Sequence, residues 1–279
     1  SEQAATGRTG LAATDLVQLS NPLSRELACM RPSLLHGIVE TVAHNVSRQT
    51  MDLALFEIGR VHRRGGEKEE QRQVAVALTG RVYPGAYGAD RQRLYDLYDL
   101  KGLLLGWFEA RGLTDVQCTE DSHPAFAPTA AATLAVAGTP LAVFGEAAPE
   151  LTVDMRLSTP LFLALIDLDQ LLALEIPAPT YTPLPQFPAT TRDISMVAPN
   201  AVTNQQVLEV INAQQCPWLE RAELFDLFED EATLGPGKRS LAYTLTYRHP
   251  ARTLTDDEAT AAHDAIRTAL AEELPITYR

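Results

Sequence analysis

The chain has 279 residues, which is enough for one large domain or two ordinary ones. A content of 46% hydrophobic and 21% charged residues is typical of a globular protein, and no apolar run approaches the roughly 18 residues of a membrane span. The formal net charge of −13 argues against nucleic-acid binding through a broad basic surface. Any RNA contact must therefore be local, or be supported by basic partner chains.

Cysteine usage and the first residues indicate the compartment. Cys29, Cys118 and Cys216 lie far apart and make an odd count. This favours reduced thiols in a cytoplasmic protein over a disulfide framework. Residues 1–10 are small and polar, without the basic and apolar segments of a secretory signal. We therefore expect a cytoplasmic location.

The first domain combines helical and strand patterns. Apolar residues recur at helical spacing in 33–48 and in 96–110, and Gly112 is placed to end the second helix in a left-handed conformation. Strand patterns cover 52–62, 73–79, 133–137, 141–144 and 161–168. Helices inserted among several strands predict an antiparallel sheet with helices packed on one face.

Five prolines mark the boundary between two domains. They fall within residues 176–191, at Pro177, Pro179, Pro183, Pro185 and Pro188. Proline at this density prevents helices and central strands and favours an extended connector. We expect a domain at 1–175, a linker at 176–191 and a second domain at 192–279.

The second domain has a clear element order. Strand patterns at 192–198, 219–228, 240–249 and 276–278 alternate with two helices. Each helix begins with a capping box, Thr203 with Gln206 and Thr255 with Glu258. The order βαββαβ predicts a ferredoxin-like sandwich.

Period-two alternation assigns the faces of the small sheet. One set in 240–249 is apolar and should lie beneath the helices: Leu241, Tyr243, Leu245 and Tyr247. The other set should face outward: Ser240, Ala242, Thr244, Thr246 and Arg248. In 219–228 we expect Phe225 and Leu227 inward, and Leu224, Asp226 and Phe228 outward. The outward set suits unpaired bases; an ordinary solvated face is the alternative, because Thr is a good strand former.

Catalytic and cofactor motifs are not found in the sequence. The pair Gly237-Lys238 has Arg239 and Ala232 where a phosphate-binding loop needs Ser or Thr and a second Gly. No C-x-x-C, H-E-x-x-H or G-x-S-x-G occurs. Asp167 and Asp169 are interpreted as solvated residues flanking Leu168. We expect no catalytic, cofactor or metal site in this chain.

Eight segments, in order along the chain, resemble one protein family. Asn21-Pro-Leu-Ser, Met30-Arg-Pro-Ser-Leu-Leu, Leu55-Phe-Glu-Ile-Gly-Arg-Val and Tyr98-Asp-Leu-Lys-Gly-Leu-Leu resemble the catalytic-like module of bacterial phenylalanyl-tRNA synthetase β subunits. Phe187-Pro-Ala-Thr-Thr-Arg-Asp-Ile-Ser, Leu224-Phe-Asp-Leu-Phe, Lys238-Arg-Ser-Leu-Ala and Arg252-Thr-Leu-Thr-Asp-Asp-Glu resemble the anticodon-binding domain that ends such subunits.

The resemblance implies an α+β fold, with a class II synthetase-like antiparallel sheet followed by the βαββαβ sandwich. It implies an α2β2 heterotetramer that joins phenylalanine to tRNA(Phe) with ATP and Mg²⁺, with the chemistry in the α subunit. This part would dock on α and bind the anticodon. Asp226 and Ser240 match family positions that contact the first anticodon base, and we add Phe228, Thr244 and Arg248 as candidate contacts.

The segment Gly59-Arg-Val-His-Arg-Arg64 resembles class II motif 2, in which an arginine holds ATP phosphate. The partner motif G-x-G-x-x-R does not occur. We therefore expect a domain without catalysis, in which Arg60, Arg63 and Arg64 are surface or α-facing residues. Two other functions remain open: a purely structural assembly module without RNA contact, and a free-standing enzyme.

Overall fold

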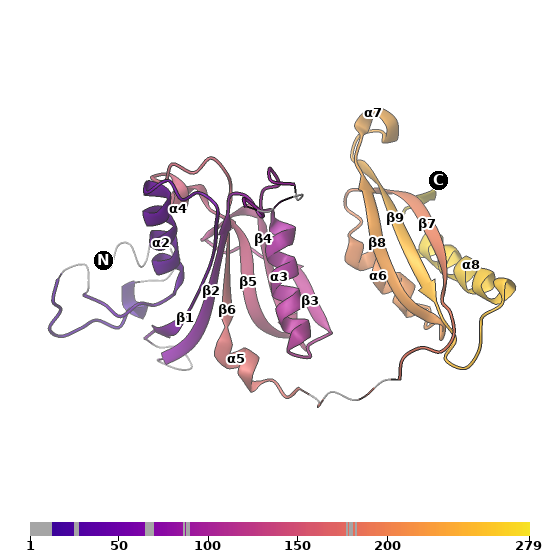
Figure 1. Cartoon of the computed structure of the whole chain (residues 1–279), viewed down its shortest axis with the longest axis horizontal. Helices are drawn as coiled ribbons and strands as arrows, with labels where there is room; N and C mark the ends of the chain where they lie inside the picture. The colour runs from indigo at the N-terminus through magenta and orange to yellow at the C-terminus, as the bar shows by residue number, and fades with distance from the viewer. Residues whose placement is uncertain are drawn as a thin grey trace. The chain divides into compact units, whose positions relative to one another are not determined.

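A computed structural model describes residues 13–24, 28–64, 70–85, 87, 90–176, 178, 181 and 183–279. The chain divides into two compact units, Ser1–Pro179 and Thr180–Arg279 (Figure 1). The described parts of 176–189 contain no helix or strand. Among the described residues, no helix is long and apolar enough to cross a membrane.

The first unit contains a six-stranded antiparallel sheet. Its strands are β1 (Leu53–His62), β2 (Glu70–Thr79), β3 (Val116–Glu120), β4 (Phe126–Val136), β5 (Thr139–Ala147) and β6 (Leu161–Asp167). The order across the sheet is β1-β2-β6-β5-β4-β3. The sequence did not predict β3, whose five residues carry no apolar stretch.

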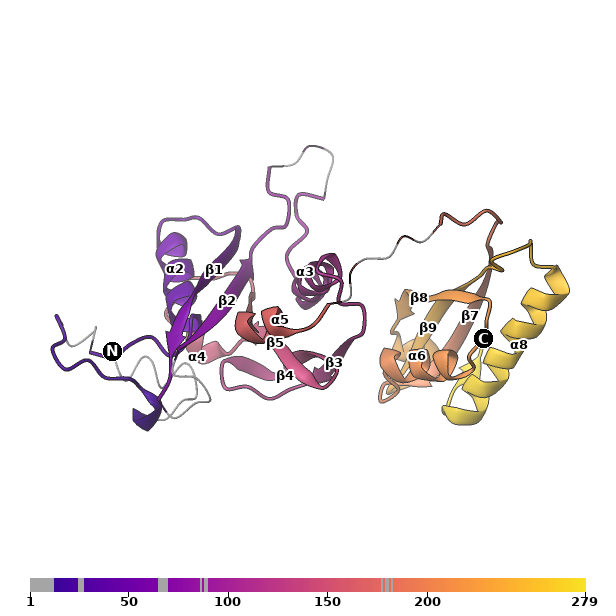
Figure 2. The ribbon, with the colours of Figure 1, turned by 90° about the horizontal axis from the view of Figure 1, so that it is seen from below.

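Helices cover both faces of this sheet, so the expectation of one covered face was wrong. Helices α2 (Leu35–Ser47) and α4 (Pro149–Thr152) pack on one face, and α3 (Leu97–Ala110) and α5 (Leu168–Ala173) on the other (Figure 2). Successive residues of β6 enter different cores, Leu163 facing α2 and Ala164 facing α3. Its unbroken apolar run is the pattern of a strand covered on both sides.

Local signals set the ends of α3. Asp96 and Asp99 form a reciprocal capping box at its start. Gly112 follows its last turn with φ +93, as predicted for a left-handed residue. A short 3-10 helix, η1 (Ala13–Asp15), lies among the first described residues.

The second unit confirms the βαββαβ order. Strands β7 (Thr190–Pro199), β8 (Leu219–Phe228), β9 (Lys238–Tyr247) and β10 (Thr277–Tyr278) form a sheet in the order β10-β7-β9-β8. Helices α6 (Asn204–Ala213) and α8 (Asp256–Glu273) cover one face, and α7 (Glu231–Leu234) follows β8. Both predicted capping boxes are present.

The inward residues of β9 are those that alternation predicted. Tyr243 and Tyr247 are fully buried with Leu241 and Leu245 beneath α6 and α8. Burial raises the pKa of Tyr243 to about 12. Its hydroxyl donates to Asn204 Oδ1 over 2.7 Å, which satisfies the polar group inside the core.

Candidate nucleic-acid interface

The face of the small sheet that α6 and α8 leave uncovered brings four of the five candidate residues together. The register pairs Asp226 with Ala242 and Phe228 with Ser240 between β8 and β9. Thr244 lies two residues further along β9, opposite Asp193 of β7, and donates to Asp193 Oδ1 over 2.7 Å. Directly opposed residues share a face of an antiparallel sheet. We call this surface the open face.

A β-bulge in β8 changes the predicted directions of two side chains. The register shifts between Leu224 and Asp226, so that Leu224 pairs with Tyr243 and Leu227 with Leu241. Leu224 consequently packs against the core, whereas Phe225 is 58% exposed. The predictions of an inward Phe225 and an outward Leu224 were therefore wrong. The extra residue of a bulge breaks period-two alternation, and the phase is restored at Asp226.

Ser240 lies on the open face but is buried, with only 6% of its surface exposed. Ser240 thus lies on the predicted face of the sheet, but the expectation that its hydroxyl is accessible to solvent was wrong. Its cross-strand neighbours on the two sides are Val197 of β7 and Phe228 of β8. Their larger side chains flank the small serine. Phe228 itself is 41% exposed.

Arg248 follows β9 and is held by internal bonds. Its Nε donates to Glu220 Oε2 and its Nη1 donates to the Phe187 carbonyl, each over 2.6 Å. Arg239 similarly donates to the Val202 carbonyl over 2.6 Å. These two arginines support the local fold, a use that their sequence spacing does not reveal.

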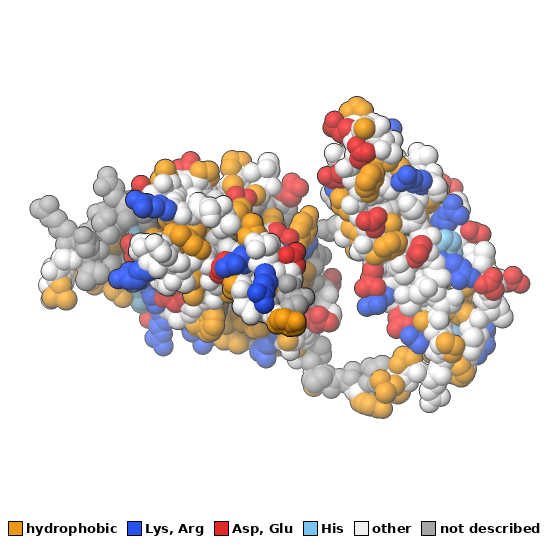
Figure 3. Space-filling view, turned by 45° about the horizontal axis from the view of Figure 1, so that its top comes forward, with side chains coloured by type: hydrophobic (Ala, Val, Ile, Leu, Met, Phe, Trp, Pro, Cys, Tyr) orange, Lys and Arg blue, Asp and Glu red, His pale blue; other side chains and the backbone are white. Residues whose placement is uncertain are grey.

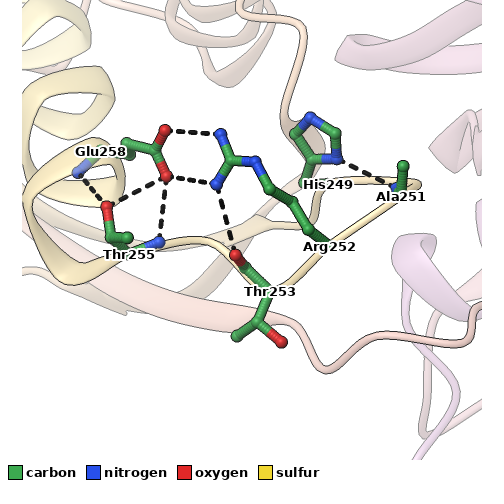
Figure 4. Close-up of polar contacts among 6 residues, drawn as sticks. All are labelled: His249, Ala251, Arg252, Thr253, Thr255 and Glu258. Atoms are coloured by element: carbon green, nitrogen blue, oxygen red, sulfur yellow. Dashed lines mark hydrogen bonds and ion pairs between the residues drawn. The ribbon is translucent and has the colours of Figure 1, made fainter.

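Arg252 belongs to the segment Arg252-Thr-Leu-Thr-Asp-Asp-Glu, and it too is used internally (Figure 4). Its guanidinium donates to both carboxylate oxygens of Glu258, over 2.7 and 2.6 Å. Glu258 in turn caps α8 by accepting from the Thr255 backbone N–H over 3.1 Å. This segment therefore orders the start of α8.

Charges on the second unit are mixed and predominantly acidic. Residues 186–279 carry eight Lys or Arg and fourteen Asp or Glu, a net of −6. On the face in Figure 3, the described acidic and basic side chains are interspersed without a continuous basic stripe. Phosphate contacts alone cannot give this surface a high affinity for RNA.

In the first unit, Arg60 and Arg64 are exposed, whereas Arg63 has intermediate exposure. Arg60 pairs with Glu70 over 2.8 Å. Arg63 is partly buried and donates from Nε to the Pro32 carbonyl over 3.0 Å. Burial lowers the pKa of its guanidinium, an effect that Asp167 and Asp15 oppose.

Arg63 lines a cavity of about 300 Å³ with Asp121, His123 and Asp167. Burial lowers the pKa of His123, so its ring is neutral at pH 7. The cavity thus has two carboxylates and one guanidinium. Among the residues that the structure describes, no group of three His, Cys, Asp or Glu side chains is arranged to hold a metal ion.

Asp167 and Asp169 hold the chain rather than simply facing solvent. Asp167 accepts from the Gln170 backbone N–H over 2.9 Å and caps α5. Asp169 accepts from the backbone N–H and Nε of Arg72, each over 2.7 Å. The interpretation of both as merely solvated residues was wrong. The Arg72 partner of Asp169 lies 97 residues away, which a sequence pattern does not show.

Comparison with known families covers almost the whole chain. The family model "Phenylalanyl tRNA synthetase beta chain CLM domain" matches residues 2–168, and "Ferredoxin-fold anticodon binding domain" matches residues 185–279. The chain belongs to the phenylalanyl-tRNA synthetase beta chain family. The predicted resemblance and fold class are thereby confirmed.

Several curated relatives are named phenylalanine–tRNA ligase beta subunit. The Bacillus licheniformis protein is 32% identical over 94% of this chain and 33% of its own length. The Pseudomonas putida protein is 34% identical over 94% of this chain and 33% of its own length. The Lactiplantibacillus plantarum protein is 33% identical over 96% of this chain and 34% of its own length. This chain therefore spans about a third of the length of these relatives.

A solved pyrrolysyl-tRNA synthetase from Desulfitobacterium hafniense matches 57% of this chain and 52% of its own, with 15% identity and a TM-score of 0.43. That likeness is too low to support a conclusion.

Proposed function

We propose that this chain is the non-catalytic C-terminal part of a phenylalanine–tRNA ligase β subunit. Its second unit binds the anticodon of tRNA(Phe), and its first unit docks on the catalytic α subunit of a cytoplasmic α2β2 enzyme. The placement of Asp226, Phe228 and Ser240 together on the open face of a family-matched anticodon-binding domain carries the proposal.

The chemistry of these residues suits a guanine. The Asp226 carboxylate is exposed and can accept from the guanine N1–H and N2–H groups. Phe228, at 41% exposure, offers a ring beside it on which a base can stack. Ser240 lies beside Phe228 with 6% of its surface exposed. Thr244 adjoins them with its hydroxyl bonded to Asp193, and Arg248 lies beyond β9.

The acidic charge favours the rival function, a structural module without RNA contact. Exposed aromatic side chains favour RNA. Phe225 and Phe228 are 58% and 41% exposed at the end of β8. Each of the two rings offers a face on which an unpaired base can stack. We therefore prefer base recognition by stacking and hydrogen bonding.

The first unit is unsuited to holding ATP. Its cavity sets Asp121 and Asp167 against the single guanidinium of Arg63, and a triphosphate there would meet more negative charge than positive. Arg60 is paired with Glu70. We assign ATP, Mg²⁺ and amino-acid activation to the α subunit.

Docking of the first unit on α is supported by an apolar surface. Phe56 and Ile58 of the edge strand β1 are 73% and 60% exposed, and Leu103 and Trp107 of α3 are 48% and 37% exposed. They line a groove of about 420 Å³. An apolar patch of this kind on an edge strand is typical of a surface that a partner covers.

Binding of a labelled tRNA(Phe) anticodon stem-loop to the full chain tests the RNA function. Asp226→Asn should weaken binding by about 10-fold or more, because a charge-assisted contact is lost. Removing a negative charge would by itself strengthen binding to RNA. Glu272→Gln, on exposed α8, therefore serves as the charge-matched control and should bind as well as the native chain or better. Equal behaviour of the two variants would favour the structural module.

Docking is tested by co-purification of the chain with a tagged α subunit. Ile58→Asp should abolish co-purification, because it places a charge in the apolar groove. Tyr98→Asp changes a side chain that is 77% exposed and outside the groove, and should have little effect. Retention of Ile58→Asp on α would show that another part of the assembly covers the groove.

A further inference from the structure

The second unit has a cavity at the end of the sheet farthest from Asp226 and Ser240. It measures about 670 Å³ and lies where β8 begins and β9 ends, lined by Trp218, Arg248, His249 and the prolines of segment 183–186. Ser240 and Arg248 are eight residues apart, which corresponds to roughly 26 Å along a strand. The cavity is thus separate from Asp226 and Ser240, and of the five candidate residues it includes Arg248 alone.

The walls of this cavity are held in place by the surrounding backbone. The Arg248 N–H donates to the Trp218 carbonyl over 2.7 Å, which joins the two walls. The Ala251 N–H donates to His249 Nδ1 over 3.0 Å, so a neutral ring carries its proton on Nε2. The Trp218 and His249 ring centroids are 6.3 Å apart at an interplanar angle of 36°. The aromatic surface is preorganised.

Arg248 provides fixed donors at the same place. Its bonds to Glu220 and to the Phe187 carbonyl use two of the five N–H donors of a guanidinium. The Glu220 carboxylate offsets its charge, so the cavity does not attract phosphate strongly. The hydrogen-bond donors of Arg248 and the acceptor of Glu220 suit the edge of a nucleobase. The aromatic rings beside them suit its face.

The net charge of −6 makes such a site important for an RNA-binding unit. Counterion release from phosphates gives little affinity here, so affinity must come from bases. Stacking of a base on an aromatic side chain contributes about 1–3 kcal/mol. Trp has the largest ring system among the aromatic residues.

We propose that this cavity is a second nucleobase site, which takes an unpaired base of the bound tRNA by stacking it on Trp218 beside His249. The hydrogen-bonding edge of this base faces Arg248 and Glu220. This inference rests on the proposed function, that the second unit binds RNA. It adds an affinity contact that is independent of the reading of guanine at Asp226.

The chain has two tryptophans, Trp107 and Trp218, so Trp107→Phe leaves Trp218 as the single tryptophan reporter. Titration of this variant with the tRNA(Phe) anticodon stem-loop should change Trp218 emission saturably. In the native background, Trp218→Leu should bind the same RNA about 5- to 150-fold more weakly. Trp218→Phe, which keeps a ring, should restore most of that affinity. The preference for guanine over adenine should stay unchanged in both.

The controls separate this site from a folding defect and from the proposed function. Circular dichroism of Trp218→Leu checks the fold, and Tyr98→Ala removes an exposed aromatic residue of the first unit, outside the apolar groove, without weakening RNA binding. Unchanged Trp218 emission, with full affinity in Trp218→Leu and a guanine preference that depends on Asp226, would overturn the second site alone. No RNA binding by the folded native chain would overturn both proposals.

Discussion

The Arg252 guanidinium and the Glu258 carboxylate form a two-point ion pair at the start of α8, with N···O distances of 2.7 and 2.6 Å. The same carboxylate accepts from the backbone N–H of Thr255. These bonds hold the pKa of Glu258 at about 2, and the bond from Arg252 has the largest effect. The pair thus connects a family motif to the stability of the second unit.

Acid should destabilise the second unit through this pair. The folded pKa of Glu258 is below its unfolded value of 4.5, so its stabilising effect is present above pH 4.5 and is lost as the pH falls toward 2. Arg252→Leu should flatten this part of the stability curve, as measured by urea unfolding from pH 2 to 7. An unchanged acid slope would show that Glu258 is not held by Arg252.

Alkali should destabilise the same unit through a buried phenol. The pKa of Tyr243 is raised by burial from 10.0 to about 12, so its contribution is present below pH 10 and is lost as the pH rises to 12. Tyr243→Phe removes the bond to Asn204 and should cost about 1 kcal/mol at pH 7. The free energy of unfolding of this variant should also fall less steeply between pH 10 and 12. A slope equal to that of the native chain would contradict this.

Gly80 and Gly138 form a matched pair for backbone strain. Both have left-handed φ, at +79 and +78. A Cβ at Gly80 would lie 2.5 Å from the Met51 carbonyl oxygen, whereas at Gly138 nothing lies within 4 Å. Gly138→Ala should cost about 1–2 kcal/mol, and Gly80→Ala about 1–3 kcal/mol more. Thermal unfolding of the two variants measures the difference, and equal costs would mean that the backbone at Met51 and Asp52 adjusts freely.

Adenylate chemistry should be absent from this chain. With Arg63 beside Asp121 and Asp167, purified chain should catalyse no ATP–pyrophosphate exchange with phenylalanine and Mg²⁺. Added α subunit serves as the positive control. Exchange by the chain alone, lost in Arg63→Ala, would restore the free-standing enzyme as the function.

Local patterns predicted most of the second unit. The capping boxes at Thr203 and Thr255 depend on residues three apart, and the buried set of β9 follows from strict alternation. Both signals are contained in a few consecutive residues, so the chain alone reveals them. Asp226 and Phe228 also came out on the predicted face, because the bulge ends before them.

Features that depend on distant residues were not predictable. The bulge at Phe225 exists only in the register between β8 and β9. The bond of Asp169 to Arg72 and the bond of Arg248 to the Phe187 carbonyl join residues 97 and 61 positions apart. The burial of Ser240 likewise depends on Val197 of another strand. Each of these changes what a candidate side chain is free to do.

Competition between two anticodon stem-loops for the full chain tests the central claim most directly. One carries guanine at the first anticodon position and the other carries adenine, and the measurement is made at low salt because the second unit is acidic. We expect the native chain to prefer guanine by about 10-fold or more, and Asp226→Asn to lose this preference. Equal binding of both RNAs by the native chain, with the fold intact, would contradict anticodon reading by the open face.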